Sequence, residues 1–398
     1  MIVAGDKGRA KLPPIAHHVD SEMVGISRSF DWLRSVTPFD TQQLWEDFDA
    51  DGRGGTPRFR YPEPGIDIAG TRELLLDLPV REIEEPVFKA LLSEKQRELD
   101  RQLELVDLRG TDGFLPVSID LFGTATAELC ADALHILDVV PPGIPGSGQF
   151  VGASHIVDAA MKQFDHYRRK CPDFSADVRR SRNVSAGLMV SNSTLLISED
   201  ARVPRDRLDA LLHHEIGTHI LTWHNGAHQP LRQLQSGLAH YDELQEGLGV
   251  LAEYLAGNLS PARLRTLAAR VIAVRHMADG ASFVDTFNEL KTRFAFTGRS
   301  AFIITTRVFR GGGLTKDVVY LRGLKRLLAY LREGHPFEQL LIGKFSLSQI
   351  PAIRKLDAAG WLQAPKLVPA YTHNAAAQRR LVECTEVPLD GLYQRLVA

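Results

Sequence analysis

Two histidines and a glutamate stand close together in the segment HHEIGTH, residues 213–219, of this 398-residue chain. Neutral imidazoles are good ligands of Zn²⁺, and a carboxylate beside them can take the proton of a bound water. His214 and His219 are therefore candidate zinc ligands, and Glu215 is the candidate general base. Residues of these types predict zinc-dependent hydrolysis.

The spacing of the two histidines is unusual for a metal site on a helix. In H-E-x-x-H the histidines are four residues apart, roughly 40° around a helix, whereas here they are five apart, roughly 140°. A π-type bulge must absorb the extra residue, and Gly217 offers no side chain to obstruct it. The sequence therefore predicts a distorted helix near 215–218. Since five of the 14 histidines lie in 213–228, a merely polar helix face stays an alternative.

A catalytic zinc usually has three protein ligands and one open position, so a third ligand is needed. His213 and His224 both compete for this role. His224 follows His219 by five residues, the same spacing that separates His219 from His214. A site with three histidines is therefore a real alternative.

The next acidic segment, 240–257, offers carboxylate ligands instead. Its leucines form an apolar stripe, and Glu246 and Glu253 lie roughly opposite this stripe. Gly247 and Gly249 are poor helix formers, so we expect another backbone or a substrate to pack closely there. This favours Glu246 over Glu253 as the third ligand, with a solvated acidic face as the alternative.

The segments around these residues are expected to be mostly helical. Residues 206–226 should form one helix, with Asp206 capping its start and Asn225-Gly226 supplying a left-handed stop. Hydrophobic periodicity predicts further helices over residues 21–50, 81–108, 124–139, 152–169 and 316–332. The segment 184–198 has few charges and predicts one or two strands. The fold class is therefore α+β, mostly helical with a small sheet beside the histidine helix.

Two segments rich in glycine and proline divide the chain. Residues 49–65 predict a loop, and residues 141–148, PPGIPGSG, resemble a linker. The resulting parts are an N-terminal arm and helix in 1–57, a helical region in 58–140 and the catalytic region in 149–398. One continuous domain over 58–398 stays open.

The composition limits the partners and the compartment. A formal net charge of -2 does not favour nucleic acid as a partner. There is no signal-peptide pattern at the N-terminus, and no apolar run approaches the roughly 18 residues of a membrane span. The three cysteines are too few and too scattered for a disulfide framework, which suits a reducing compartment. We expect a cytoplasmic protein without a membrane partner; its oligomeric state is not indicated.

The runs HHEIGTHILTWHNG and LQEGLGVLAEYLAG closely resemble the tyrosine carboxypeptidases that act on tubulin tails. They also resemble the bacterial relatives of these enzymes, the flavohemoglobin expression-modulating QEGLA-motif proteins. The last alanine of that motif is Gly249 here, and similar segments cover most of 60–360. The resemblance implies a zincin-like zinc metallopeptidase with ligands His214, His219 and Glu246 and with Glu215 as general base. Tubulin is not implied as the substrate.

Two other segments of the resemblance suggest how a substrate binds. GLMVSNSTLLIS, which contains Asn192, can be an edge strand that pairs with an extended substrate or, equally, an ordinary core strand. In RVFRGGGLTKDVVY, Arg307, Arg310 and Lys316 are candidates for binding a terminal carboxylate. Tyr320 is a candidate for stabilising an oxyanion. Surface salt bridges and a core tyrosine are the alternatives.

The function predicted from the sequence is a zinc metallopeptidase of the carboxypeptidase kind, which removes residues from the C-terminus of a peptide or protein. The alternative is a regulatory protein that keeps the fold without catalysis and acts by binding a partner.

Overall fold

The computed structural model describes residues 12–143, 149–182 and 187–393. Most of the predicted N-terminal arm, most of the linker at 141–148 and the beginning of the predicted strand segment at 184–198 lie outside these ranges. The fold is mostly helical with a small sheet, so the predicted α+β class is confirmed.

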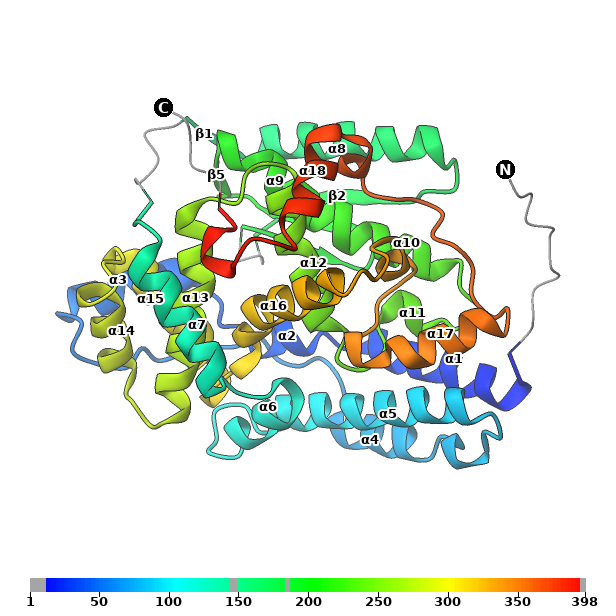
Figure 1. The fold of residues 1–398 in the computed structure, drawn as a ribbon. Coiled ribbons are helices and arrows are strands. Elements are labelled where there is room, and N and C mark those ends of the chain that lie inside the picture. The colour runs from blue at the N-terminus through cyan, green and yellow to red at the C-terminus, as the bar shows by residue number, and fades with distance from the viewer. Residues whose placement is uncertain (1–11, 144–148, 183–186, 394–398) are drawn as a thin grey trace.

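The first part of the chain is helical and forms one side of the molecule. Its helices are α1 (Pro14–Ser29), α2 (Trp32–Ser35), α3 (Thr41–Ala50), α4 (Ile68–Leu76), α5 (Pro86–Asp107), α6 (Phe114–Phe122) and α7 (Ala127–Val139). In Figure 1, α4, α5 and α6 lie side by side along the lower edge, and α17 lies above α5. Helix α1 begins at Pro14, earlier than predicted, because proline suits the first turn of a helix.

The strands lie in two small sheets next to α8 (Ala153–Lys170). In the three-stranded sheet, β4 (Thr194–Ser198) is central, with β2 (Asp177–Ser181) parallel to it and β3 (Leu188–Ser191) antiparallel. In the second sheet, β1 (Phe150–Gly152) pairs with β5 (Arg202–Pro204). The small sheet packs beside the helix that carries the histidines, as predicted.

The rest of the chain is again helical. The histidine helix consists of α9 (Leu208–His214), a π-helix (Glu215–Ile220) and α10 (Leu221–Ala227). The helices that follow are α11 (Gln233–Ser236), α12 (Tyr241–Leu255), α13 (Pro261–Ala278), α14 (Phe283–Thr292), α15 (Gly298–Phe309), α16 (Val318–Arg332), α17 (Ile350–Ala358) and α18 (Ala375–Glu383). Short 3₁₀ turns connect several of them, and α12 and α16 cross near the centre of the molecule (Figure 1).

Two hydrophobic cores meet at the histidine helix. The smaller core joins α8 and the strands to Ile216 and Ile220 of the π-helix. The larger core runs from Leu12 to Leu392 and includes Leu244 of the predicted stripe on α12. The histidine helix therefore packs its apolar side on the sheet region and turns its other side towards α12. The predicted division of the chain into three parts stays a prediction, but all three parts contribute to the larger core.

The expected ends of the histidine helix are wrong. Asp206 lies in a 3₁₀ turn, and α9 starts after it at Leu208 without a side-chain cap. Gly226 lies inside α10 with an ordinary φ, and a Cβ there would overlap the main chain of Leu234. Asn225 is buried and its amide donates to two main-chain carbonyls of distant segments. The Asn-Gly pair therefore serves close packing instead of ending the helix.

Within the described residues, no single helix is both long and apolar enough to cross a membrane. Helices α6 and α7 together have the length and the apolar composition of a membrane span. The two helices are bent by 86° at the break between them.

Candidate metal centre and active site

The helix that carries the two histidines changes its hydrogen-bonding pattern at Glu215, where the π-helix begins. In a π-helix the bonds span five residues instead of four, so residues five apart lie on the same side. The ring centroids of His214 and His219 lie 5.1 Å apart. The predicted distortion near 215–218 is confirmed. A Cβ on Gly217 would lie 3.6 Å from its nearest neighbour, so lack of space does not require a glycine there.

Glu246 on α12 completes a group of three ligand-type side chains with His214 and His219. One ligand atom from each lies within 4.8 Å of the others. Oε2 of Glu246 is 3.4 Å from Nε2 of His214 and 3.9 Å from Nε2 of His219. Nitrogen and oxygen ligands of a tetrahedral zinc lie roughly 3.3–3.4 Å from one another. The donor types and their convergence therefore fit zinc.

Each histidine is held by a side chain of α12 through its other ring nitrogen. Oε1 of Glu253 lies 3.0 Å from Nδ1 of His214, and Oε1 of Gln245 lies 3.3 Å from Nδ1 of His219. A metal-binding imidazole almost always donates its second N–H to an oxygen of this kind. This arrangement orients both Nε2 atoms towards Glu246. The sequence ranked Glu253 below Glu246 as a ligand and did not reveal its role as the partner of His214.

The pKa values of the two histidines are shifted in opposite directions by their surroundings. Burial disfavours a charged His214, but the carboxylates of Glu246 and Glu253 raise its pKa to about 10. Burial lowers the pKa of His219 to about 4 and raises the pKa of Glu215 to about 7. The proton of His214 therefore supplies, between two carboxylates, the positive charge that a bound cation would supply.

The two glycines that follow Glu246 mark close approaches, as predicted. A Cβ on Gly247 would lie 2.6 Å from the carbonyl carbon of Gly323, so α12 and α16 cross with their backbones in contact. A Cβ on Gly249 would lie 2.5 Å from the ring of His214. This imidazole therefore packs directly on the α12 backbone, at the position where the QEGLA signature has alanine.

The other histidines considered as ligands lie elsewhere. The ring of His213 packs edge-on against Tyr371 at a centroid distance of 5.4 Å, and its Nε2 is 3.6 Å from Asp209. His224 lies with Cys171, where Nε2 and Sγ are 3.6 Å apart. The alternative prediction of a zinc site with three histidines is therefore wrong.

A cavity of about 330 Å³ opens beside His214 and Glu215. Glu215 is the only carboxylate on its wall among the described residues, and the wall is otherwise rich in cations. The cationic and aromatic residues of the wall are Arg202, Arg207, Arg263, Arg270, Arg307 and Tyr320. Glu253 lies behind this wall and binds Arg207 and Arg263. The cavity therefore favours an anionic group close to the candidate general base.

Two arginines of this wall differ in how firmly they are held. Arg307 makes a bidentate ion pair with Asp317, at 2.6 and 2.7 Å. Nε of Arg270 has no hydrogen bond among the described residues and lies 3.5 Å from the same aspartate. Its guanidinium packs over Tyr320, 5.0 Å from the ring centroid. Arg270, which the sequence analysis missed, is therefore the more available donor. In the sequence, Arg270 follows Arg263 by seven residues, which places both arginines on one face of α13. This spacing could have indicated that Arg270 belongs to the same site.

Two cations expected to bind substrate have other roles. Lys316 is buried, with Nζ 2.7 Å from Asp242 and 3.6 Å from Oε1 of Glu246, so it supports the metal group. Arg310 is buried as well, lies outside the cavity wall and donates to Thr37 at 2.7 Å. Arg307 and Tyr320 do lie on the wall, as the sequence predicted.

The beginning of β3 lies on the cavity wall, which includes Leu188, the first residue of the strand, and Gly187 directly before it. It is an edge strand, because its sheet has the order β2-β4-β3. The N–H of Ser198 donates to the carbonyl of Gly187, so antiparallel alternation directs the polar main-chain atoms of Leu188 and Val190 away from β4. Asn192, a predicted substrate contact, lies instead in the exposed turn between β3 and β4 with a φ of 54°, away from the cavity wall.

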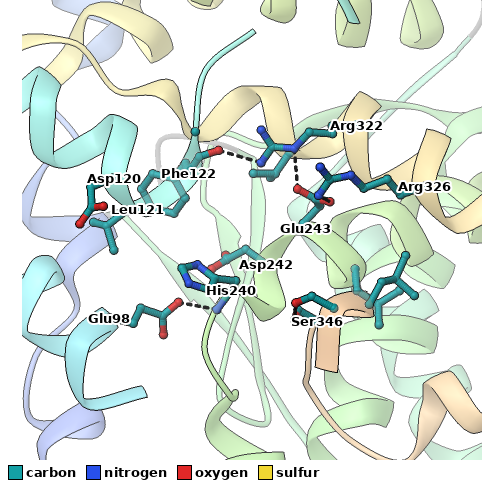
Figure 2. Close-up of a pocket in the computed structure, with 15 residues that line it drawn as sticks. Glu98, Asp120, Leu121, Phe122, His240, Asp242, Glu243, Arg322, Arg326 and Ser346 are labelled. Carbon is teal, nitrogen blue, oxygen red and sulfur yellow. Dashed lines mark hydrogen bonds and ion pairs between the residues drawn. The ribbon is translucent and has the colours of Figure 1, made fainter. Parts of the chain in front are cut away.

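Figure 2 shows a second cavity of similar volume, about 340 Å³, whose charged groups are already paired. Arg322 donates to Glu243 at 2.5 Å and to the carbonyl of Phe122 at 2.7 Å. Glu98 accepts a hydrogen bond from the N–H of His240 at 2.7 Å. Neither histidine of the metal group lies on its wall. Volume therefore does not distinguish the two cavities, whereas the chemistry of their walls does.

Comparisons with known proteins agree with the geometry. The family model of the microtubule-associated tyrosine carboxypeptidases matches residues 46–387. The human microtubule-associated tyrosine carboxypeptidase 1 is 31% identical over 211 residues, which are 50% of this chain and 43% of the human protein. The match thus spans less than half of that protein's length.

Two solved structures are also similar in outline. A putative lipoprotein from Colwellia psychrerythraea aligns with a TM-score of 0.45 and 11% identity, over 80% of this chain and 70% of the other. A putative lipoprotein from Shewanella oneidensis aligns with a TM-score of 0.39 and 13% identity, over 73% and 71%.

The fold and the site define a mostly helical protein with one histidine directly before a π-helix, a second histidine within it, and a glutamate on the helix that packs against it. The match over residues 46–387 then shows the family: the chain belongs to the microtubule-associated tyrosine carboxypeptidases.

Proposed function

We propose that this protein is a zinc-dependent carboxypeptidase that acts on the C-terminus of a peptide or protein. The observation that carries the proposal is the convergence of His214, His219 and Glu246 beside a cavity that Glu215 lines. Membership of the family supports a carboxypeptidase type of reaction. The human relative's name mentions a tyrosine and microtubules, and neither is part of the proposal.

His214, His219 and Glu246 would hold the zinc ion through their converging nitrogen and oxygen atoms. When bound, zinc supplies a Lewis acid that polarises the scissile carbonyl and makes water acidic enough to react near neutral pH. Glu253 and Gln245 keep the two imidazoles oriented for this role.

Glu215 is the proposed general base, which takes the proton of the attacking water and returns it to the leaving amine. Its side chain is adjacent to His214 and reaches the cavity. Glu243 and Glu253, two other carboxylates of the acidic segment, are committed elsewhere. Glu253 is fully buried between arginines, and Glu243 lies on the wall of the other cavity, where it binds Arg322.

The arginine-rich wall is the proposed binding site for the substrate's terminal carboxylate. Arg270 offers a guanidinium that is not tightly paired, and guanidinium groups bind carboxylates through charge-assisted hydrogen bonds. Tyr320 shares this wall and is the candidate donor to the oxyanion. A carboxylate held here stands next to Glu215, which places the last peptide bond near the base.

The edge of β3 is the proposed binding site for the substrate's main chain. The outward-facing groups of Leu188 and Val190 can pair with an extended peptide as an added strand. Because β3 begins at the cavity, such a peptide would run from the sheet edge towards the arginine wall.

The proposal is tested with two matched peptides, one with a free C-terminal carboxylate and one with a C-terminal amide, and zinc-loaded protein. The free acid should be cleaved at its last bond at least about tenfold faster, because one decade corresponds to about 1.4 kcal/mol of lost binding. Arg270→Gln should reduce this preference, mainly by raising KM for the acid.

Arg205→Gln is the matched control, because Arg205 is exposed and lies outside the cavity wall. It should keep the preference for the acid. Equal cleavage of acid and amide, or cleavage in the middle of the peptide, would overturn the carboxypeptidase proposal. No cleavage of any peptide by fully zinc-loaded protein would favour the regulatory alternative.

A further inference from the structure

A second group of ligand-type side chains lies where α8 meets the end of the histidine helix. Cys171 directly follows α8, Asp173 lies in the turn after it, and His224 lies on α10. One ligand atom from each of these three lies within 4.8 Å of the others. His228, which directly follows α10, adds an imidazole whose Nε2 is 2.8 Å from Asp173. This group shares no residue with the group of His214, His219 and Glu246.

We propose that Cys171, Asp173, His224 and His228 form a second metal site that binds a zinc-class divalent ion and fastens α8 to the histidine helix. One thiolate, two imidazoles and one carboxylate make four ligands, the number of a closed structural zinc site. Such a site has no open position for a substrate, so its role is structural.

One distance within the group, between the cysteine and a histidine, is close to that of a metal site. A sulfur roughly 2.3 Å and a nitrogen roughly 2.0–2.1 Å from a tetrahedral zinc lie about 3.5 Å apart. Sγ of Cys171 and Nε2 of His224 lie 3.6 Å apart. Both side chains are buried; Cys171 directly follows α8, and His224 lies on α10. This pair therefore forms the prearranged half of the site.

The carboxylate ligand of the proposed site, Asp173, can change its orientation. Sγ of Cys171 donates to Oδ1 of Asp173 at 2.6 Å, a contact that depends on the thiol proton. Metal binding releases that proton, because the ligand form of cysteine is the thiolate. The side chain of Asp173 is 61% exposed, so it is free to turn until its oxygen faces the ion.

The ring of His228 is already oriented as a ligand. Its Nδ1 lies 2.9 Å from the carbonyl oxygen of His224 and must donate to it, since a carbonyl only accepts. In the neutral ring this leaves a lone pair on Nε2, which faces the carboxylate of Asp173 at 2.8 Å. A cation, either a proton or a metal ion, can bridge these two atoms, and a zinc ion would hold them roughly 3.3–3.4 Å apart. Donation of the second N–H to a main-chain carbonyl is typical of metal-binding histidines.

A cysteine nucleophile is a weaker interpretation of the same residues. In a nucleophilic triad the carboxylate holds the histidine that activates the thiol. Here the carboxylate of Asp173 accepts from the thiol itself and contacts His228, not the neighbour of the thiol, His224. Three ligand-type atoms converge and His228 joins them through Asp173, so the arrangement does not form a relay.

Cobalt gives a direct test, because a cobalt–thiolate bond adds an ultraviolet charge-transfer band that histidine and glutamate ligands lack. Metal-free protein is titrated with Co²⁺ and separately with Zn²⁺, and bound metal is measured by elemental analysis. Wild type should bind two equivalents and show the band. Cys171→Ser should bind one equivalent and lose the band, whereas His214→Ala should bind one and keep it.

Cys130→Ser is the matched control, since this cysteine is partly buried, belongs to neither ligand group and donates its thiol proton to the carbonyl of Ala125. It should keep two equivalents and the band. Asp173→Asn changes an exposed side chain, so it should fold normally, as judged by circular dichroism. It should weaken metal binding at the second site about tenfold or more, at least as much as losing an outer-shell partner.

A wild-type protein that binds one equivalent without a thiolate band would overturn the second site. So would a band that persists in Cys171→Ser. The proposed zinc peptidase is judged separately, by the metal lost in His214→Ala. The two proposals can therefore fail independently.

Discussion

Each ligand group takes two histidines from the histidine helix or from the residue directly after it, yet the two groups are built differently. The group of His214 and His219 faces α12 in the interior, and each histidine has a second partner from that helix. The group of His224 and His228 faces the turn after α8, and its carboxylate, Asp173, is exposed. The first group borders a cavity lined by arginines, whereas none of the second group's residues lies on that wall.

In the two proposals, the surroundings of similar ligands separate a catalytic site from a structural one. A reactive centre needs an open side for substrate and buried partners that keep the ligands oriented. A structural centre needs only enough ligands to saturate the ion. Substitutions that affect one group and spare the other test this distinction.

The largest effect is expected for Glu215→Gln. The proposed base would lose its ability to accept a proton, and turnover should fall by about 10²–10⁴-fold. Bound metal should stay unchanged at both groups, because Glu215 belongs to neither. Peptide hydrolysis and elemental analysis measure the two quantities. Glu243→Gln, on the wall of the other cavity, should keep the activity. Full turnover in Glu215→Gln would show that another group is the base.

Glu253→Gln should have the next largest effect. The change keeps the size of the side chain but removes the carboxylate that holds Nδ1 of His214. Loss of such a partner typically weakens metal binding by about 10–100-fold. A competition titration with a zinc chelator measures this affinity. The visible spectrum of bound Co²⁺ reports the geometry of the first group.

The thiolate band of the second group should not change in Glu253→Gln, which provides an internal control. Glu199→Gln, an exposed change at a surface ion pair with Arg182, should leave both affinities intact. Unchanged zinc affinity in Glu253→Gln would mean that the partner carboxylate does not orient the ligand.

Gly323→Ala tests the crossing that brings α12 and α16 together. A Cβ there would overlap the main chain of Glu243, so the helices must move apart. Overpacking of this kind lowers the free energy of unfolding by about 1–3 kcal/mol. Urea unfolding measures it. The shift should also weaken metal binding at the first group, because Lys316 precedes α16 and contacts Glu246.

Gly25→Ala is the matched control with the opposite expected sign. Gly25 lies inside α1 with no atom within 4 Å of a Cβ, so alanine should stabilise the helix by about 0.5–1 kcal/mol. If Gly323→Ala were also stabilising, the two helices would not be in the close contact that the structure shows.

Local geometry explains why much of the first group was predictable. The angle between residues five apart on a helix is fixed, so two ligands at this spacing require a wider turn. Gly247 and Gly249, poor helix formers inside a helix, indicated that something packs closely on α12, and the structure shows Gly323 and His214 there. Hydrophobic periodicity likewise predicted most of the helices, whereas β3 and β4 were predicted from the few charges of their segment.

Charged side chains were harder to place, because spacing along the chain does not tell which partner a charge will meet. Lys316 and Arg310 flank a glycine-rich turn and were expected to bind substrate, yet one contacts Glu246 and the other Thr37. Arg270, which is less tightly paired than Arg307, lies within the otherwise ordinary helix α13, whose sequence did not indicate a substrate-binding residue.

The sequence by itself determined the ligand types, the distorted helix and the family. Only the tertiary structure decided which distant residues meet. Cys171 is 53 residues from His224, and Glu253 is 39 residues from His214. A helix fixes neighbours within a few residues of each other, whereas contacts over such separations depend on how whole elements pack.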